Sequence, residues 1–330
     1  ETMMLIRRLA VVLMLGASVL HPWSDTAGAA EWPARVVKIV VPSAPGGSSD
    51  AAARIIANHF QAVFGQPFVI ESKPGAGGGT GAAYVAQAEP DGYTLLISNT
   101  AANLTIPLVQ KNFSYDPVKD FTHIAMLSGT PYALCVHPSL GVTTLAGFIA
   151  KAKQSPGVLT YTAANTGGLG HMSGEYFKRL AGIDVRHVPY RGGGPATADA
   201  IAGHVQAILL PLSTLGEHVR SGELVALAVS SRTRSAAFPS LPTFAESGFP
   251  QMVYTGWFGL SAPKDLPASI VSRLNTEARV ALKTPVMRDM MEREGSELLD
   301  TDSAGFTTMI AGEVARWSKI LATMDIRLEE

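Results

Sequence analysis

The sequence has few of the features that mark disulfide-stabilised, nucleic-acid-binding or membrane-spanning proteins. It contains a single cysteine, so no internal disulfide can form. Its 26 Lys and Arg residues are balanced by 27 Asp and Glu residues, and the net charge is −1. The basic excess that usually accompanies nucleic-acid binding is therefore missing. No apolar run reaches the roughly 20 residues that a transmembrane helix needs. We expect neither a nucleic-acid partner nor a membrane anchor.

Motifs for catalysis, cofactors and metals are also scarce. The sequence has no H-E-x-x-H, C-x-x-C, G-K-[ST] or G-x-S-x-G motif. The segment Gly77–Ala82 matches G-x-G-x-x-A, but the acidic residue expected about 20 positions later is missing. A tight strand-to-helix turn is favoured over a dinucleotide site. Cys135 lies in an apolar run typical of a buried strand, and a catalytic thiol with a histidine nearby is the alternative. We expect no cofactor, no metal and no catalytic residue.

Residues 1–29 have the pattern of a secretory signal peptide. Arg7 and Arg8 form a charged segment, Leu9–Leu20 is apolar, and Ala27-Gly28-Ala29 is a small-x-small cleavage site. We predict that the mature chain starts at residue 30 or 31 and is exported.

Apolar runs then alternate with amphipathic helical segments. This order predicts a β-α-β-α-β unit over residues 36–98 and a second α/β series over residues 143–229, with short strands at 122–127 and 133–136 between them. Residues 99–120, with two prolines, are predicted to be irregular. A strand at 253–260 and helices at 267–282, 285–294 and 303–324 follow. The alternation predicts an α/β fold of two lobes, each a mostly parallel sheet flanked by helices.

The last three helices have no sheet of their own, so we predict that they pack back on the first lobe. The first lobe would then be discontinuous, formed by residues 30–128 and 254–330, and the second would be formed by residues 129–253. The chain would cross between them near residues 128–131 and 252–255.

The loop from Ser43 to Asp50 joins a buried strand to a helix and is rich in backbone donors. Gly46 and Gly47 allow close approach of the backbone to a ligand, and the helix start leaves N–H groups free. Together with the helix dipole, these make an anion site. A plain turn capped by Ser48 or Ser49 is the alternative. Asp50 could complement the dipole, order the loop amides or accept from a ligand hydroxyl.

Similar glycine-rich turns recur at Ala164–His171 and Tyr190–Pro195 in the second half. Ligands of open α/β sheets bind outside the carboxyl ends of strands, where Thr100 would also stand. Two facing lobes could therefore clasp an anion between opposing helix starts. His171 begins a helix, and capping or pocket lining is favoured over a role as general base because no partner carboxylate is marked by spacing.

Several motifs together resemble one family. They are Val40-Val41-Pro42, Pro45–Asp50, Gly65-Gln66-Pro67, Lys73–Gly78 with Gly81-Ala82, Pro90–Leu96, Tyr115–Phe121, His171 with Gly174-Glu175 and Phe177-Lys178, His187–Tyr190 and Trp257–Leu260. On these residues the mature chain resembles the Bug-type (TctC-like) solute-binding receptors of tripartite tricarboxylate transporters.

The resemblance implies a periplasmic, two-lobed "Venus flytrap" receptor that binds a small carboxylate and presents it to membrane transporter subunits. It implies that the first-helix loop and the loop matching Asn165–His171 hold the ligand. The expected site residues are Ser43, Ala44, Gly46, Gly47, Ser48, Asp50, Thr100, Asn165, Thr166, Gly167, Gly168, Leu169, Gly170 and His171. We expect the receptor to be a monomer.

The chain departs from the family pattern in both loops. Ser43 stands where the family often has an aromatic residue, and Gly168–Gly170 replace the usual hydroxyl residues and include the apolar Leu169. We therefore expect a mono- or dicarboxylate with an apolar or aromatic body. The alternatives are a periplasmic hydrolytic enzyme on a similar scaffold and a ligand-sensing receptor that docks on a signalling ectodomain.

Overall fold

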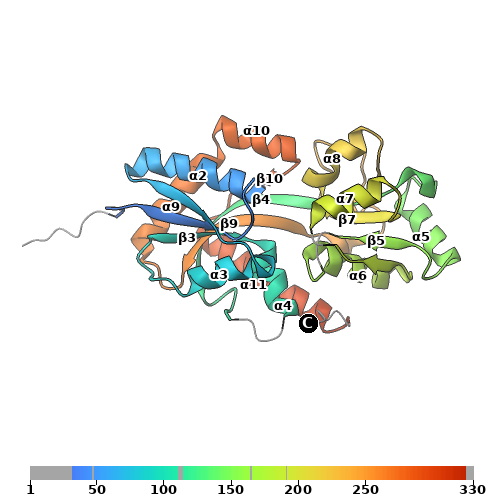
Figure 1. Cartoon of the computed structure of the whole chain (residues 1–330), viewed down its shortest axis with the longest axis horizontal. Coiled ribbons are helices and arrows are strands. Elements are labelled where there is room, and N and C mark those ends of the chain that lie inside the picture. The colour runs from blue at the N-terminus through green and yellow to red at the C-terminus, as the bar shows by residue number, and fades with distance from the viewer. Residues whose placement is uncertain (1–31, 47, 111–113, 164–165, 191, 325–330) are drawn as a thin grey trace, which may run out of the picture.

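The computed structural model describes residues 32–324 except 47, 111–113, 164–165 and 191. The predicted signal peptide, residues 1–29, lies outside the described residues. Figure 1 shows an elongated molecule with two α/β halves, and long strands run from one half into the other. The predicted two-lobed α/β fold is confirmed.

The first lobe is built on the β-α-β-α-β unit predicted from the sequence. Strand β1 (Val37–Val41) pairs in parallel with β2 (Phe68–Ser72) and β3 (Thr94–Asn99). Helix α2 (Ser48–Phe64) follows β1 and buries its apolar face, and the 3-10 turn η1 (Ala76–Gly78) and helix α3 (Gly79–Ala86) precede β3. The parallel order places the carboxyl ends of β1 and β3, and thus the loops after them, at one edge of the sheet.

Residues 99–120 were predicted to be irregular, and this was wrong for their first part. They begin with the π-helical turn η2 (Ala101–Thr105) and the short helix α4 (Ile106–Val109). The Asn99 side chain accepts from the Ala102 N–H at 2.9 Å, as an N-terminal cap does. Pro107 is the second residue of α4, which continues η2 without a break because Thr105 and Ile106 both have helical φ and ψ.

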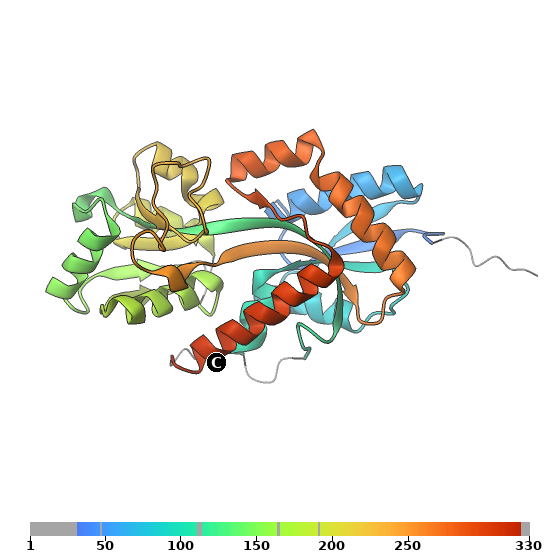
Figure 2. The ribbon, with the colours of Figure 1, turned by 180° about the vertical axis from the view of Figure 1, so that it is seen from behind.

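Strand β4 (Phe121–Val136) passes through both lobes. Its first part pairs antiparallel with β9 (Thr255–Pro263) as far as Pro131. Its last five residues pair with β7 (Ala207–Pro211), and the last four of these also pair with β8 (Val225–Val229). Figure 2 shows β4 and β9 as the long green and orange strands that join the halves. The two short strands predicted at 122–127 and 133–136 are one strand, because residues 128–131 keep their pairing with β9.

The second lobe repeats the parallel arrangement. Strand β5 (Thr160–Thr162) pairs in parallel with β6 (Arg186–Val188) and β7. The other elements of this lobe are η3 (Pro138–Leu140), α5 (Leu145–Gln154), α6 (Leu169–Ala181), α7 (Gly193–Ile201), α8 (Leu212–Arg220) and η4 (Pro250–Met252). The helix starts of α7 and α8 both lie beside β7.

The last three helices are α9 (Ala268–Leu282), α10 (Pro285–Glu294) and α11 (Ser303–Leu321), with the short strand β10 (Glu297–Leu298) paired to β4. Helix α9 packs on α2 and β4, whereas α10 contacts both α2 and α8. On α11, Trp317 is fully buried and its ring lies 6.2 Å from Tyr254 and 6.4 Å from Tyr176. Helices α10 and α11 therefore contact both lobes, and the division at residues 128 and 254 stays a prediction.

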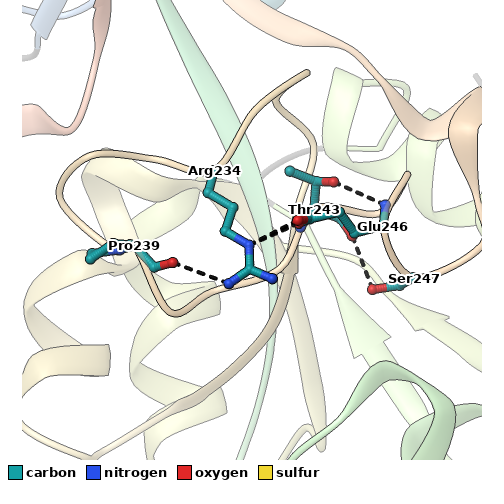
Figure 3. Close-up of polar contacts among 5 residues, drawn as sticks. All are labelled: Arg234, Pro239, Thr243, Glu246 and Ser247. Carbon is teal, nitrogen blue, oxygen red and sulfur yellow. Dashed lines mark hydrogen bonds and ion pairs between the residues drawn. The ribbon is translucent and has the colours of Figure 1, made fainter.

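A polar cluster pins the long loop that leads from β8 back to β9. Arg234 Nε lies 3.0 Å from both carboxylate oxygens of Glu246, and its Nη1 donates to the Pro239 carbonyl at 3.2 Å (Figure 3). Glu246 also accepts from the Thr243 N–H at 2.7 Å. Ser230 lies just before this loop, and its Oγ donates to the carbonyl of Tyr254, just after the loop, at 2.7 Å. These hydrogen bonds fix the two ends of the loop relative to each other and so fix the start of β9.

Candidate ligand-binding site

A cleft of about 1,070 Å³ lies where the two lobes meet. Its wall is formed by residues from both lobes and from the two connecting strands. They are Pro42–Gly46, Ser49, Pro74, Gly75, Gly77, Gly78, Asn99–Ala101, Thr130, Tyr132, Gly193, Gly194, Pro211, Ser213, Thr214 and Gly256–Phe258. None of these described lining residues carries a charge. A bound anion would be held by backbone N–H groups, hydroxyls and helix starts rather than by an ion pair.

Part of the first-lobe loop lines the cleft, and Asp50 lies behind it. Ser43, Ala44 and Gly46 line the cleft, whereas the Asp50 side chain is only 6 % exposed and does not. The Gly46 N–H donates to Asp50 Oδ2 at 3.1 Å, and Arg54 Nε donates to the same oxygen at 3.0 Å. The hydrogen bond from Arg54 holds the pKa of Asp50 below its usual value. Of the roles considered for Asp50, this geometry favours ordering the loop.

The start of α2 faces the cleft through Ser49. Its hydroxyl lies 2.8 Å from that of Ser43, so the two side chains tie the end of the loop to the first helical turn. Gly47 and the side chain of Ser48 lie outside what the structure describes.

Thr100 lines the cleft and joins the first lobe to β9. Its Oγ1 accepts from the Trp257 N–H at 2.7 Å and lies 3.3 Å from the Trp257 carbonyl, to which it donates. The hydroxyl is therefore engaged by the backbone of a connecting strand.

The second-lobe loop, Asn165–His171, contains the remaining expected site residues. Its described part, Thr166–His171, does not line the cleft, and Asn165 lies outside the described residues. Gly170 packs against the far side of the cleft wall: a Cβ there would lie 2.5 Å from the Leu209 carbonyl and 3.5 Å from Tyr132 Cε1. Tyr132 itself lines the cleft, so its ring lies between the cleft and Gly170.

His171 orders its own loop. The Gly167 N–H donates to His171 Nδ1 at 3.0 Å, and the imidazole stacks on His187 with centroids 4.0 Å apart. Burial lowers the pKa of His171 and takes that of His187 to about 3. Both rings are neutral at ordinary pH. Of capping, pocket lining and a role as general base, which the sequence left open, this geometry assigns none, because the His171 ring bonds the loop residue Gly167.

The second lobe meets the cleft through the starts of two other helices. Gly193 and Gly194 open α7, and Ser213 and Thr214 lie in the first turn of α8. The turn before α7 was recognised from its glycines but was not included among the expected site residues. The start of α8 has no glycine signal, and Tyr132 lies inside an apolar run, so neither was identified from the sequence.

The described residues hold no group of three or more His, Cys, Asp or Glu side chains that could bind a metal ion. Cys135 is fully buried, and burial raises the pKa of its thiol, which stays protonated. Within the described part of the chain, no helix has the length and apolar character required to cross a bilayer.

Comparison with known proteins identifies the family. A family model described as the tripartite tricarboxylate transporter family receptor, TctC, matches residues 52–326. Protein BugT of Bordetella pertussis is 33 % identical over 299 residues, covering 90 % of this chain and 92 % of BugT. The structure of R. palustris Rpa4515 with adipate has a TM-score of 0.80 at 35 % identity, covering 89 % of this chain and 98 % of that one.

A second solved structure, MatC (Rpa3494) from Rhodopseudomonas palustris with bound malate, has a TM-score of 0.77 at 29 % identity. It covers 88 % of this chain and 100 % of MatC. The likeness thus extends over both lobes and the strands between them. The chain belongs to the TctC family of tripartite tricarboxylate transporter receptors, which are periplasmic solute-binding proteins rather than enzymes.

Proposed function

We propose that this receptor captures a small organic carboxylate in the cleft and delivers it to membrane subunits of a tripartite tricarboxylate transporter. One observation carries the proposal: the starts of α2, α7 and α8 converge on a cleft whose described lining has no acidic side chain. Helix starts attract anions, and an acidic wall would repel them. The adipate and malate of the two similar structures are both small dicarboxylates.

The lining also favours a ligand with an apolar body. Between the polar helix starts lie Pro42, Pro45, Tyr132, Trp257 and Phe258. Apolar walls with a few placed polar groups are typical of small-molecule sites. We infer a mono- or dicarboxylate whose charged end meets the 43–46 loop and whose aliphatic or aromatic body meets this wall, in a receptor that works as a periplasmic monomer.

The test is a titration of the purified protein with citrate, succinate, malate, adipate, benzoate and nicotinate, followed by calorimetry and thermal unfolding. A carboxylate that binds the folded state stabilises it by about 2.7 kcal/mol at a hundredfold excess over its Kd. If all six leave both heat and Tm unchanged after the protein has been unfolded and refolded to remove any bound solute, the proposed ligand class is wrong.

A pair of variants locates the site. Gly46 has φ of +91° and lies in the cleft-lining loop, whereas Gly65 has φ of +69° at the opposite end of α2, and neither has an atom within 4 Å of an added Cβ. Valine strains both positions similarly. Gly46→Val should abolish ligand binding, and Gly65→Val should lower Tm but keep Kd. Equal affinities in the two variants would place the ligand elsewhere.

A further inference from the structure

Tyr132 occupies a fixed position between the two lobes. It lies on β4 where this strand leaves β9 and begins to pair with β7. Its N–H donates to Ser230 Oγ, and its carbonyl accepts from the Ser230 N–H, both at 2.8 Å. Its ring lies 5.7 Å from that of Tyr254. The backbone and the ring of Tyr132 are therefore held by protein contacts alone.

The ring fills the gap between the connecting strand and the first turn of α6. A Cβ added to Gly256 on β9 would lie 2.9 Å from Tyr132 Cε2, and one added to Gly170 on α6 would lie 3.5 Å from Cε1. Contacts near 2.9 Å are shorter than van der Waals packing allows, so the ring fits only because position 256 has no side chain. The ring thereby separates the cleft from the glycine-rich start of α6.

Two tyrosines of the second lobe use their hydroxyls in hydrogen bonds to carboxylates. Tyr161 donates to Glu175 at 2.7 Å and Tyr190 donates to Asp199 at 2.5 Å. The Tyr132 hydroxyl has no hydrogen-bond partner among the described residues, and it lies beside Gly256 in the cleft wall. Burial raises the pKa of this phenol, so the oxygen keeps its proton and can donate it.

We propose that Tyr132 selects the ligand by length: its ring closes the cleft on the side of α6, and its hydroxyl donates to the ligand group farthest from the 43–46 loop. This inference rests on the proposed function, because it assumes that a carboxylate binds with one end at that loop. It assigns the receptor a preference for acids whose far end carries an acceptor, such as a second carboxylate.

The experiment measures Kd by calorimetry for succinate, adipate, suberate and sebacate, and for hexanoate as the acid that lacks a second carboxylate. Tyr132→Phe removes only the hydroxyl. It should keep the length of the best-bound diacid and weaken its binding about tenfold, as expected for one hydrogen bond to a charged group, while hexanoate is unaffected. Tyr132→Ala opens the space in front of α6 and should move the best-bound diacid to a longer member of the series.

Tyr176→Ala is the matched control, because Tyr176 is a half-buried tyrosine that packs on Trp317 and does not line the cleft. It should leave the order of affinities unchanged. Tyr132→Leu keeps an apolar side chain and replaces Tyr132→Ala if the latter fails to fold, as judged by circular dichroism. An unchanged order of diacids in a folded Tyr132 variant overturns length selection. If the wild-type protein binds none of these five acids but binds an acid of the first panel, length selection by Tyr132 is wrong and the carboxylate proposal stands. If it binds no acid of either panel, the carboxylate proposal itself fails, so the two results are distinguishable.

Discussion

The backbone N–H of Gly46 is hydrogen-bonded to the carboxylate of Asp50, although only Gly46 reaches the cleft. Asp50 therefore acts on the ligand through the loop. We expect Asp50→Ala to weaken carboxylate binding about tenfold, because a freed loop must be ordered when the ligand binds. Arg54→Gln removes the ion pair but keeps the Gly46 bond, and it should change Kd much less. Equal losses in the two calorimetric titrations would assign the effect to the Arg54 charge instead.

The same carboxylate gives a pH-dependent contribution to stability. Its pKa is lowered in the folded protein, so its contribution is complete above about pH 4, where the unfolded chain's aspartates are ionised. The contribution is lost as the pH falls through the lowered folded-state pKa. Urea unfolding should show the difference in free energy between wild type and Asp50→Ala shrinking below pH 4. A difference that grows on acidification would contradict this sign.

His123 should make the protein sensitive to mild acid. It is 1 % exposed, with Nε2 3.0 Å from the Pro117 carbonyl, and burial lowers its pKa to about 4. Between pH 6.5 and 4 the unfolded chain binds a proton that the folded protein excludes, so stability falls with pH by up to about 3 kcal/mol from this residue. His123→Gln should make the urea-unfolding profile shallower over that range, and the remaining slope should come from His171 and His187, whose pKa values burial also lowers.

Gly256 should control the position of the Tyr132 ring. An alanine Cβ would come within 2.9 Å of Cε2, and no positive φ hinders the substitution. Gly256→Ala should displace the ring and change the order of diacid affinities with a modest loss of stability, about 1–3 kcal/mol, typical of overpacking. The readouts are calorimetry with the diacid series and urea unfolding. Unchanged affinities together with unchanged stability would show that the ring moves freely.

The Arg234–Glu246 pair should protect its loop without affecting the ligand. Both side chains are nearly half exposed, but Glu246 also accepts from the Thr243 N–H (Figure 3). We expect Glu246→Ala to speed proteolytic cleavage between residues 231 and 249 and to leave carboxylate Kd unchanged. Arg232→Ala is the control, since Arg232 is exposed in the same loop. Equal cleavage rates in the two variants would mean that the pair does not hold the loop.

Much of the fold was predictable because its signals are local. The apolar segment 36–41, the amphipathic helix after it and the Pro285 helix start each follow from neighbouring residues. The same reasoning failed at Pro107, because a proline does not always end a helical segment, and η2 continues into α4 here. It also divided β4 into two strands, since the pairing of residues 128–131 with β9 involves partners over 120 residues away.

The candidate site divides in the same way. The Ser43–Gly46 loop could be proposed as a site from the sequence, because glycines between a strand and a helix are a local signal and the family motifs lie in the sequence itself. The position of Tyr132 was not predictable, because nothing in an apolar strand indicates which side chain will face a second lobe. The sequence alone accounts for the α/β series, the glycine-rich turn before the first helix and the family. Only the tertiary structure decided that Tyr132 lies beside Gly170, where β4, β9 and α6 pack together, and that the starts of α7 and α8 line the cleft. These contacts join segments that are distant in the sequence, so they depend on how the whole chain packs.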